Sequence, residues 1–464
     1  MADGAGKPHV PGTDRTTGCN ISSSSPSRLN NEDASVELSN VLNILGYGSE
    51  LRQKRREYFK QLGDAVKVII VGSKAEGILR VFESDIDSLY VNERVACLEV
   101  GYDVNLIPEN KLVFRMDTSI CYPGHCILLL ERGFPSLFVS ALCYNGHGRF
   151  LLSSDAFINL RRKYLPPLMR DERAGPSLPI SFGPISCDCV VSLRCHCPSI
   201  LQKWAARSRH WPPPNIVGKV VSMGAVLTPV GFKESENMPN EWRVCFNTGE
   251  TELVINLNDT QIKVYVLLKM IAKDVLKPRQ KGITSFMVKN IILWLAENNP
   301  QSTFHDRRLI FWLLESLKEL RTALSTKYLP YYMIPERNLM TACRLTVTLQ
   351  RKWMATLTDM IVEGPEMLRR LPKIRQAIIA HPEPLLWYTR RRIEMEIIFL
   401  EMLTHCDPVN NNNFFNMFDF MDRHGLTLRL MEICGDFIAN MCSEENIDIL
   451  NIVQLFNFFY RVLA

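Results

Sequence analysis

The sequence predicts an α+β protein in which a mixed α/β region is followed by an all-helical region. Short β-branched segments bounded by glycine occur in the first half, and long apolar and amphipathic segments follow from about Leu257. The chain has 464 residues, which is long for one domain and natural for two or three. Hydrophobic residues make up 46% and charged residues 22%, the balance of a globular protein with a substantial core.

Residues 1–35 are predicted to form a disordered tail. They are rich in Ser, Gly, Pro and Asn and poor in large apolar residues, so they cannot bury enough surface to offset the entropy of ordering. The sequence has neither an apolar signal segment nor a run of 18 apolar residues. We therefore expect no transmembrane helix, no membrane partner and a cytoplasmic protein whose 14 cysteines are reduced.

The ordered elements follow in sequence from Val36. Apolar residues recur there at helical spacing through LRQKRREYFKQL, which predicts one long, basic amphipathic helix. AVKVIIVG predicts a short strand that ends at Gly72, and SDIDSLYV predicts a second strand. Further strands are predicted within residues 97–155, at ISCDCVVSLRC and at EWRVCF, before the helical second half.

Residues 71–90, VGSKAEGILRVFESDIDSLY, combine two devices that suit phosphate chemistry. Gly72 lets backbone N–H groups approach a phosphate at the start of a helix, and Ser73 adds a hydroxyl. Asp85 and Asp87, spaced i and i+2 on a strand, direct both carboxylates to one face. Because adjacent like charges are costly, we expect Mg²⁺ between them, completed by nucleotide phosphates.

Each device alone also has an ordinary structural explanation. A Gly-Ser after a strand is usually a turn, and an Asp-x-Asp on a strand is usually a solvated face. Their order and spacing together are more specific than either motif.

Gly-Ser followed after about ten residues by acid-apolar-acid resembles the nucleotidyltransferase superfamily signature. GSKAEG…ESDIDSLYV is similar to the cyclic GMP–AMP synthase-like receptors and the related male-abnormal (Mab) family, and the similarity spans about residues 55–340. Matching blocks are EWRVCF, KGITSFMVKNIILWLAENNP and KYLPYYMIPERNLM. The resemblance implies a bilobal nucleotidyltransferase fold with a mixed β-sheet catalytic lobe and a long spine helix. The expected parts are the tail 1–35, a catalytic lobe 36–256, a helical lobe 257–345 and a helical extension 346–464 of unknown role.

The resemblance also implies further site residues. Asp188 is the expected third acid, since Gly-Pro precedes its strand and Arg-Cys follows it; the alternative is a structural strand-end residue. Family positions that contact the nucleotide match Arg243, Lys269, Ser285 and Phe286, besides Gly72 and Ser73. Phe286 stands where Tyr is frequent and Cys245 where a small hydroxyl residue is common, so the base preference is open. Surface salt bridges remain an alternative for Arg243 and Lys269.

The implied partners are nucleoside triphosphates and double-stranded nucleic acid, either RNA or DNA. The basic helix carries Arg52, Lys54, Arg55, Arg56 and Lys60, which would contact phosphate backbone without reading sequence. Such a run is otherwise a solvated helix face. The resemblance also allows oligomerisation on the activator. The cluster from Cys187 to Cys197 lacks the spacing of structural zinc sites, so we do not expect zinc.

Three functions follow from these observations. The first is a nucleic-acid-activated enzyme of innate immune signalling that makes a cyclic dinucleotide from ATP and/or GTP, with Mg²⁺, or Mn²⁺ in its place, held by Asp85, Asp87 and Asp188. The second is a catalytically silent binding or scaffold protein of the Mab family. The third is a nucleotidyltransferase that extends RNA ends, which the blocks after residue 240 fit less well.

Overall fold

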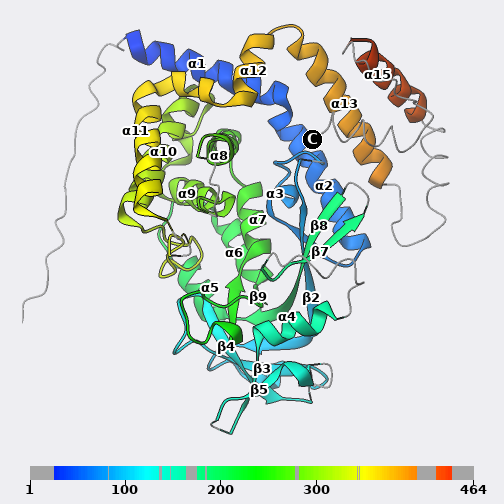
Figure 1. Ribbon diagram of the computed structural model, residues 1–464, viewed down its shortest axis with the longest axis vertical. Coiled ribbons are helices and arrows are strands. Elements are labelled where there is room, and N and C mark those ends of the chain that lie inside the picture. Colours follow the sequence, from blue (N-terminus) through cyan, green and yellow to red (C-terminus); the bar gives the residue numbers. More distant parts are fainter. Residues whose placement is uncertain are drawn as a thin grey trace, which may run out of the picture.

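The computed structural model describes residues 26–81, 83–134, 138–146, 148–163, 175–182, 185–276, 282–341, 343, 345–404 and 425–440. These residues form an α+β protein, which confirms the predicted class (Figure 1). The β-sheet occupies one end of the molecule, and the helices that follow it in sequence pack at the other end. Residues 1–25 of the predicted tail lie outside the described residues.

The N-terminal helix begins earlier than the sequence predicts. Helix α1 spans Pro26–Leu42, so residues 26–35 are helical rather than part of a tail. The Ser35 side chain is buried, donates a hydrogen bond to the Asn31 carbonyl, and accepts one from the backbone N–H of Ile310. Tertiary packing against the later helices therefore stabilises a segment whose composition alone would not fold.

The predicted single long helix is two helices. A π-turn, η1 (Asn43–Tyr47), separates α1 from α2 (Ser49–Ala65). Gly46 has φ of 90° there, a left-handed conformation that a helix cannot contain. The apolar spacing continues across this break because both helices bury a face against the same molecule, which is why periodicity did not reveal it.

Ten described strands form one mixed sheet. They are β1 (Ile69–Val71), β2 (Ile86–Leu98), β3 (Leu112–Asp117), β4 (His125–Arg132), β5 (Leu142–Tyr144), β6 (Phe150–Leu152), β7 (Leu178–Phe182), β8 (Ile185–His196), β9 (Ala225–Thr228) and β10 (Glu241–Cys245). The main path runs β1-β2-β3-β4-β10-β9-β8-β7, and a further pairing between β2 and β8 closes it into a ring. The parallel β2–β8 pair joins two segments that lie far apart in sequence.

Short helices connect the strands and cover the sheet. They are α3 (Gly72–Ala75), η2 (Val104–Leu106), η3 (Val139–Ala141), α4 (Ser154–Arg162), α5 (Pro198–Ala205), α6 (Pro214–Met223) and η5 (Met238–Asn240). The predicted first strand is shorter than expected, because Lys67 adopts a left-handed φ of 55° and β1 begins at Ile69.

The helical region follows the last strand, but it begins at Asn247, ten residues before the predicted start at Leu257. It comprises α7 (Asn247–Ile255), α8 (Asp259–Met270), η6 (Ile271–Val275), α9 (Ser285–Asn298), η7 (Gln301–Thr303), η8 (Asp306–Arg308) and α10 (Leu309–Thr326). A capping box between Asn258 and Gln261 fixes the start of α8, and Thr284 caps α9. Helices α8, α9 and α10 share one hydrophobic core with the sheet.

The C-terminal extension packs in two places. Its helices are α11 (Val347–Glu363), η9 (Gly364–Arg370), α12 (Pro372–Ala380), α13 (Leu385–Thr404) and α15 (Leu426–Asn440). Helix α11 lies along α10, whereas α13 packs against α2 and α15 packs against α13 (Figure 1). Phe59 of α2 and Phe399 and Phe437 of the extension belong to one buried cluster. No helix in the described part of the chain is long and apolar enough to cross a membrane.

Candidate active site

The Gly-Ser motif lies directly after β1, where the chain turns into the one-turn helix α3. Gly72 has φ of +68°, and a Cβ atom placed on it would lie 2.8 Å from Oδ2 of Asp87. Glycine is therefore required here by both backbone conformation and space. Because α3 is only four residues long, its dipole contributes less to phosphate binding than the sequence suggested, and local N–H groups and side chains contribute more.

Two of the three predicted acids lie side by side on paired strands. Asp87 of β2 is in register with Asp188 of β8, and Val71, the residue before Gly72, pairs with Asp87 from the other side. Asp188 accepts a hydrogen bond from the Ser177 hydroxyl at 2.7 Å. The pairing brings the Gly-Ser turn and two carboxylates together at one end of the sheet.

Asp85 departs from the predicted position. Strand β2 begins at Ile86, so Asp85 lies just before the strand rather than on it and is exposed. It nevertheless lines the same cavity as Asp87 and Asp188. The buried side chain of Ile86 between the two acids keeps both of them on the cavity side.

The electrostatics of this cluster favour a bound cation. Asp87 keeps exposed surface toward the cavity, yet partial desolvation by its surroundings, followed by the neighbouring Asp188 carboxylate, raises its pKa to about 6, although Lys289 opposes the rise. A cation would relieve this repulsion, and three carboxylates are the oxygen donors that Mg²⁺ prefers. Within the described residues no three His, Cys, Asp or Glu side chains already lie close enough together to hold a metal ion. The carboxylates would therefore have to draw together around it.

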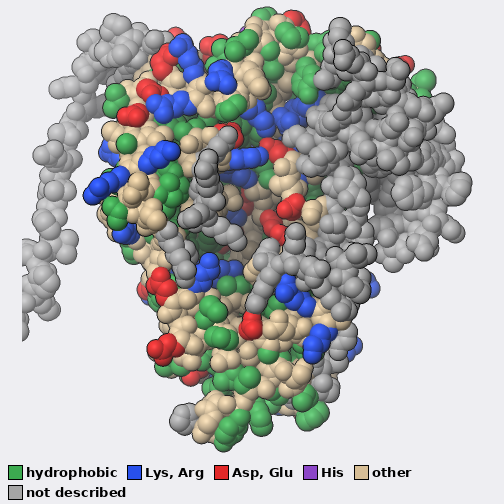
Figure 2. Space-filling view, in the orientation of Figure 1, with side chains coloured by type: hydrophobic (Ala, Val, Ile, Leu, Met, Phe, Trp, Pro, Cys, Tyr) green, Lys and Arg blue, Asp and Glu red, His purple; other side chains and the backbone are tan. Residues whose placement is uncertain are grey.

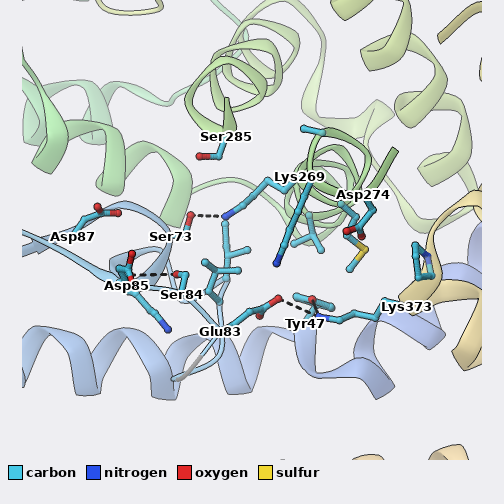
Figure 3. A pocket seen from close by; sticks show the side chains of 18 of the residues that line it. Tyr47, Ser73, Glu83, Ser84, Asp85, Asp87, Lys269, Asp274, Ser285 and Lys373 are labelled. Atoms are coloured by element: carbon cyan, nitrogen blue, oxygen red, sulfur yellow. Dashed lines mark hydrogen bonds and ion pairs between the residues drawn. The ribbon is translucent and has the colours of Figure 1, made fainter. Parts of the chain in front are cut away.

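Lys269 and Ser285 reach the same cavity from the helical region. The Lys269 ammonium group, at the end of α8, donates a hydrogen bond to the Ser73 hydroxyl. Burial lowers the pKa of Lys269 to about 8, even though Glu76 opposes the shift. Ser285, the first residue of α9, lines the cavity opposite Ser73 (Figure 3). Together these groups form a polar pocket suited to a polyphosphate.

Two adjoining cavities share Asp87 and Asp188. The large cavity has a volume of about 1050 Å³ and extends from the acids past Lys269 toward Lys373. The small cavity, of about 360 Å³, lies on the other side of Asp87. Ser73, Asp87, Asp188 and Ser285 line both cavities. Figure 2 shows acidic and basic side chains around a hollow near the middle of the molecule.

The remaining predicted residues line the small cavity. Arg243 lies on β10, and Phe286 follows Ser285 at the start of α9. Cys245 lines the same cavity and lies 3.4 Å from the Thr228 hydroxyl. An aromatic face, a guanidinium group and small polar groups are the components of a nucleobase site. Every predicted site residue therefore lines at least one of the two cavities. Asp85 and Lys269 line only the large cavity, whereas Gly72, Arg243 and Phe286 line only the small one.

Sequence reasoning missed a buried ionic network at the wall of the small cavity. Lys289 of α9 lies 2.7 Å from Glu76 and 3.6 Å from Glu250, and Glu250 accepts a hydrogen bond from the Tyr331 hydroxyl at 2.6 Å. Burial alone would lower the pKa of Lys289, but the two carboxylates raise it above its usual value. A lysine inside the apolar run MVKNIILWLA was the available signal, because a charged residue buried there needs partners.

The basic helix differs from the prediction at two residues. Arg55 is fully buried and forms a two-point ion pair with Glu396 of α13, with both N–O distances at 2.8 Å. Arg52 is also buried and pairs with Asp259 at 2.5 Å. These two arginines therefore hold the fold together and are not available to nucleic acid. Lys54, Arg56 and Lys60 retain exposed surface, and Lys54 has a long contact of 3.9 Å with Glu401.

The cysteines near Asp188 have reduced thiols. Cys187 and Cys189 are partly buried in β8, while Cys195 and Cys197 are buried near its end. Burial raises the pKa of Cys187 and of Cys189. Such thiols are poor nucleophiles at neutral pH.

The site combines a Gly-Ser turn that faces paired acids with a lysine beside a helix start. A comparison with known families finds a match in the helical region. The model of the Mab-21 protein HhH/H2TH-like domain matches residues 260–355. Over these residues the chain is similar to the Mab-21 family. The match covers helices α8 to α10 and the first half of α11. It covers none of the sheet that carries the acids. No curated protein matches the chain.

Proposed function

We propose that this protein is a nucleotidyltransferase that joins ATP and/or GTP into a cyclic dinucleotide when double-stranded nucleic acid activates it, as a sensor in innate immune signalling. The observation that carries the proposal is the register of Asp87 with Asp188 beside the Gly72–Ser73 turn. This arrangement supports phosphoryl transfer because it gathers carboxylates, a hydroxyl and N–H groups at one strand end. The sensor role rests on the sequence resemblance, whereas the geometry of the site supports only the phosphoryl transfer.

The residues divide the chemistry between them. Ser73, Lys269 and Ser285 would bind the triphosphate of the donor nucleotide in the large cavity. The attacking ribose hydroxyl forms a new P–O bond at the α-phosphorus, the bond to the β-phosphate breaks, and pyrophosphate leaves. Asp188 would orient the hydroxyl and accept its proton.

Asp85, Asp87 and Asp188 fit divalent metal by their chemistry and by their mutual repulsion. Mg²⁺, or Mn²⁺ in its place, would supply electrostatic stabilisation of the charge that develops on the phosphates. Before it binds, the Asp87 carboxylate is held in an unfavourable environment, so the chain keeps its acids ready for a cation at the expense of some stability.

The small cavity supports a site for the nucleobases. Phe286 would stack on a base, and Arg243 would donate hydrogen bonds to base or phosphate acceptors. The acids lie where the two cavities meet, so a nucleotide with its base in the small cavity would extend its phosphates into the large one. The order of small cavity, acids and large cavity thus matches the order of base, ribose and phosphates along a nucleoside triphosphate.

The proposed nucleic-acid surface is smaller than the sequence suggested. Lys54, Arg56 and Lys60 are the cations of the basic helix that keep exposed surface. They would contact phosphates through charge rather than base identity, so binding would weaken steeply with salt. RNA and DNA are both candidates.

The test is product formation by the full-length protein. Purified protein is incubated with ATP, GTP and Mg²⁺, alone or with long double-stranded RNA or DNA, and the products are resolved by mass. We expect a cyclic dinucleotide that requires one of the nucleic acids and is absent in the Asp85→Asn/Asp87→Asn variant. If no product forms with either nucleic acid and either metal, the silent scaffold becomes the better explanation. Linear products added to RNA ends would instead indicate the third function.

A further inference from the structure

The wall of the large cavity includes part of the C-terminal extension. Pro372, Lys373 and Gln376 of α12 line the same cavity as Ser73 and Asp87. The family match ends at residue 355, so α12 lies outside the matched segment. Because α12 forms part of the cavity wall, the extension contributes to the site and does more than pack against the outside of the fold.

Lys373 reaches the loop that leads to the acids. Its ammonium group lies 3.1 Å from Oε1 of Glu83 and 3.0 Å from the Tyr47 hydroxyl (Figure 3). It also lies 5.6 Å from the centre of the Tyr47 ring. The Glu83 side chain is only 12% exposed and that of Lys373 29%, so the pair is shielded from bulk water.

Glu83 belongs to the loop 76–85, which connects the Gly-Ser motif to Asp85 and of which residue 82 lies outside the described residues. The other Glu83 oxygen accepts a hydrogen bond from the Arg80 backbone N–H at 3.3 Å. On the inner side, the buried ammonium group of Lys74 donates to the carbonyls of Arg80 and Val81. The loop is therefore fixed between Lys74, next to Ser73, and Lys373 of the extension.

A second set of hydrogen bonds links the extension, through Arg55 of α2, to the start of this loop. Arg55, which Glu396 of α13 holds by two hydrogen bonds, directs its Nη1 atom to the carbonyls of Gly46 at 2.9 Å and Gly77 at 3.4 Å. Arg392 of α13 donates to the Leu45 carbonyl at 2.9 Å. The extension thus contacts the loop directly at Glu83 and, through Arg55 of α2, indirectly at Gly77.

We propose that Lys373 is a positioning residue of the nucleotide cavity, which through Glu83 and Tyr47 holds the 76–85 loop so that Ser73 and Asp85 face the same nucleotide. The extension then completes the site in cis. This inference rests on the proposed function only for the identity of the nucleotide. Removing the pair loosens the loop, and substrate binding weakens more than turnover, because the acids and Ser73 remain intact.

The test compares four full-length variants with the wild type. Lys373→Met removes the charge and keeps most of the side-chain length, and Lys373→Arg keeps the charge. The double variant Lys373→Glu/Glu83→Lys reverses the pair. The matched control is Arg370→Met, which breaks the ion pair of Arg370 with Glu363, a partly exposed pair inside the extension whose two residues do not line the cavity.

The first measurement is hydrogen–deuterium exchange of residues 74–85 without nucleotide. We expect Lys373→Met to raise exchange there about fivefold, the population change that loss of one shielded ion pair gives to local opening. Lys373→Arg and the reversed pair restore slow exchange, and Arg370→Met leaves it unchanged. Unchanged exchange in Lys373→Met, or an equal rise in Arg370→Met, would overturn the inference.

The second measurement is the Michaelis constant for ATP and the turnover number with Mg²⁺ and activator. We expect Lys373→Met to raise KM several-fold more than it lowers kcat, with recovery in Lys373→Arg. An equal effect on kcat in both lysine variants would contradict a positioning role. Because exchange needs neither nucleotide nor product, an inactive wild type with a loosened Lys373→Met loop would reject the proposed function and retain the inference.

Discussion

Asp87 of β2 and Asp188 of β8 occupy paired positions on adjacent parallel strands, and Gly72 lies so close to Asp87 that a single added methyl group would meet its carboxylate. This relationship couples the phosphate-binding turn to the acids. A movement of the Gly72–Ser73 turn would displace the Asp87 carboxylate, and a change of charge on that carboxylate would alter the electrostatic environment of the turn.

Replacing Asp87 by Asn is expected to stabilise the metal-free protein while abolishing product formation. The charge of Asp87 is disfavoured by partial desolvation and by Asp188, so its removal relieves repulsion. Because the side chain also faces solvent in the cavity, screening limits the gain to about 1 kcal/mol. Thermal unfolding in EDTA measures it. A variant less stable than the wild type in EDTA would contradict the account of the acids.

Lys269 should make polyphosphate binding depend on pH. Its pKa in the folded protein is about 8, so its positive charge is lost as pH rises through 8, well below the usual range for lysine. Binding of inorganic tripolyphosphate should therefore weaken by up to about tenfold between pH 7 and 9. Isothermal titration across this range checks the slope. Lys269→Arg keeps its charge, and an equally steep slope in that variant would exclude Lys269 as the cause.

Gly72→Ala should be more harmful than an alanine at another left-handed glycine. The new methyl group pays the conformational penalty at φ of +68° and also meets Asp87, for a total of about 2–3 kcal/mol. Gly101 is the matched control, since its φ is +87° and nothing lies within 4 Å of an added Cβ. Thermal unfolding and nucleotide binding separate the two, with Gly101→Ala close to wild type in binding. Equal loss of binding in both variants would refute the contact with Asp87.

Arg55→Ala should destabilise the protein by about 3–5 kcal/mol, because it leaves the buried Glu396 carboxylate without its partner. Lys54→Ala on the same helix should cost less than about 1 kcal/mol, since its contact with Glu401 is long and exposed. Denaturant unfolding of both variants measures the difference. A near-neutral Arg55→Ala that specifically lost nucleic-acid binding would show that Arg55 belongs to the interface after all.

The sequence predicted the parts of the site that depend on local spacing. The Gly72–Ser73 turn and the cavity-facing Asp87 follow from a strand, a glycine and an alternating strand pattern. Asp188 is expected from the family resemblance, and the register of β2 with β8 brings it beside Asp87. Asp85 lies one residue outside the strand, because strand ends depend on pairing partners that a local pattern does not contain.

The residues that the sequence could not reveal are those defined by distant partners. Arg55 has the spacing of a solvated basic face, and only the packing of α13 against α2 makes it a buried ion-pair partner. The same holds for the contacts of Lys289 with Glu76 and of Lys373 with Glu83. Tertiary packing decides burial, and burial decides whether a charged residue binds a partner inside the chain or outside it.

The most direct test of the central claim is the location of Mn²⁺ in crystals of the protein grown with a non-hydrolysable ATP analogue. Anomalous scattering identifies the metal independently of the nucleotide. We expect a Mn²⁺ peak in contact with the carboxylates of Asp85 and Asp87, with the triphosphate at Ser73 and Lys269. A nucleotide bound elsewhere would contradict the assignment of an active site. So would a nucleotide that binds here in the same way to the wild type and to the Asp85→Asn/Asp87→Asn variant, with no metal peak in either protein.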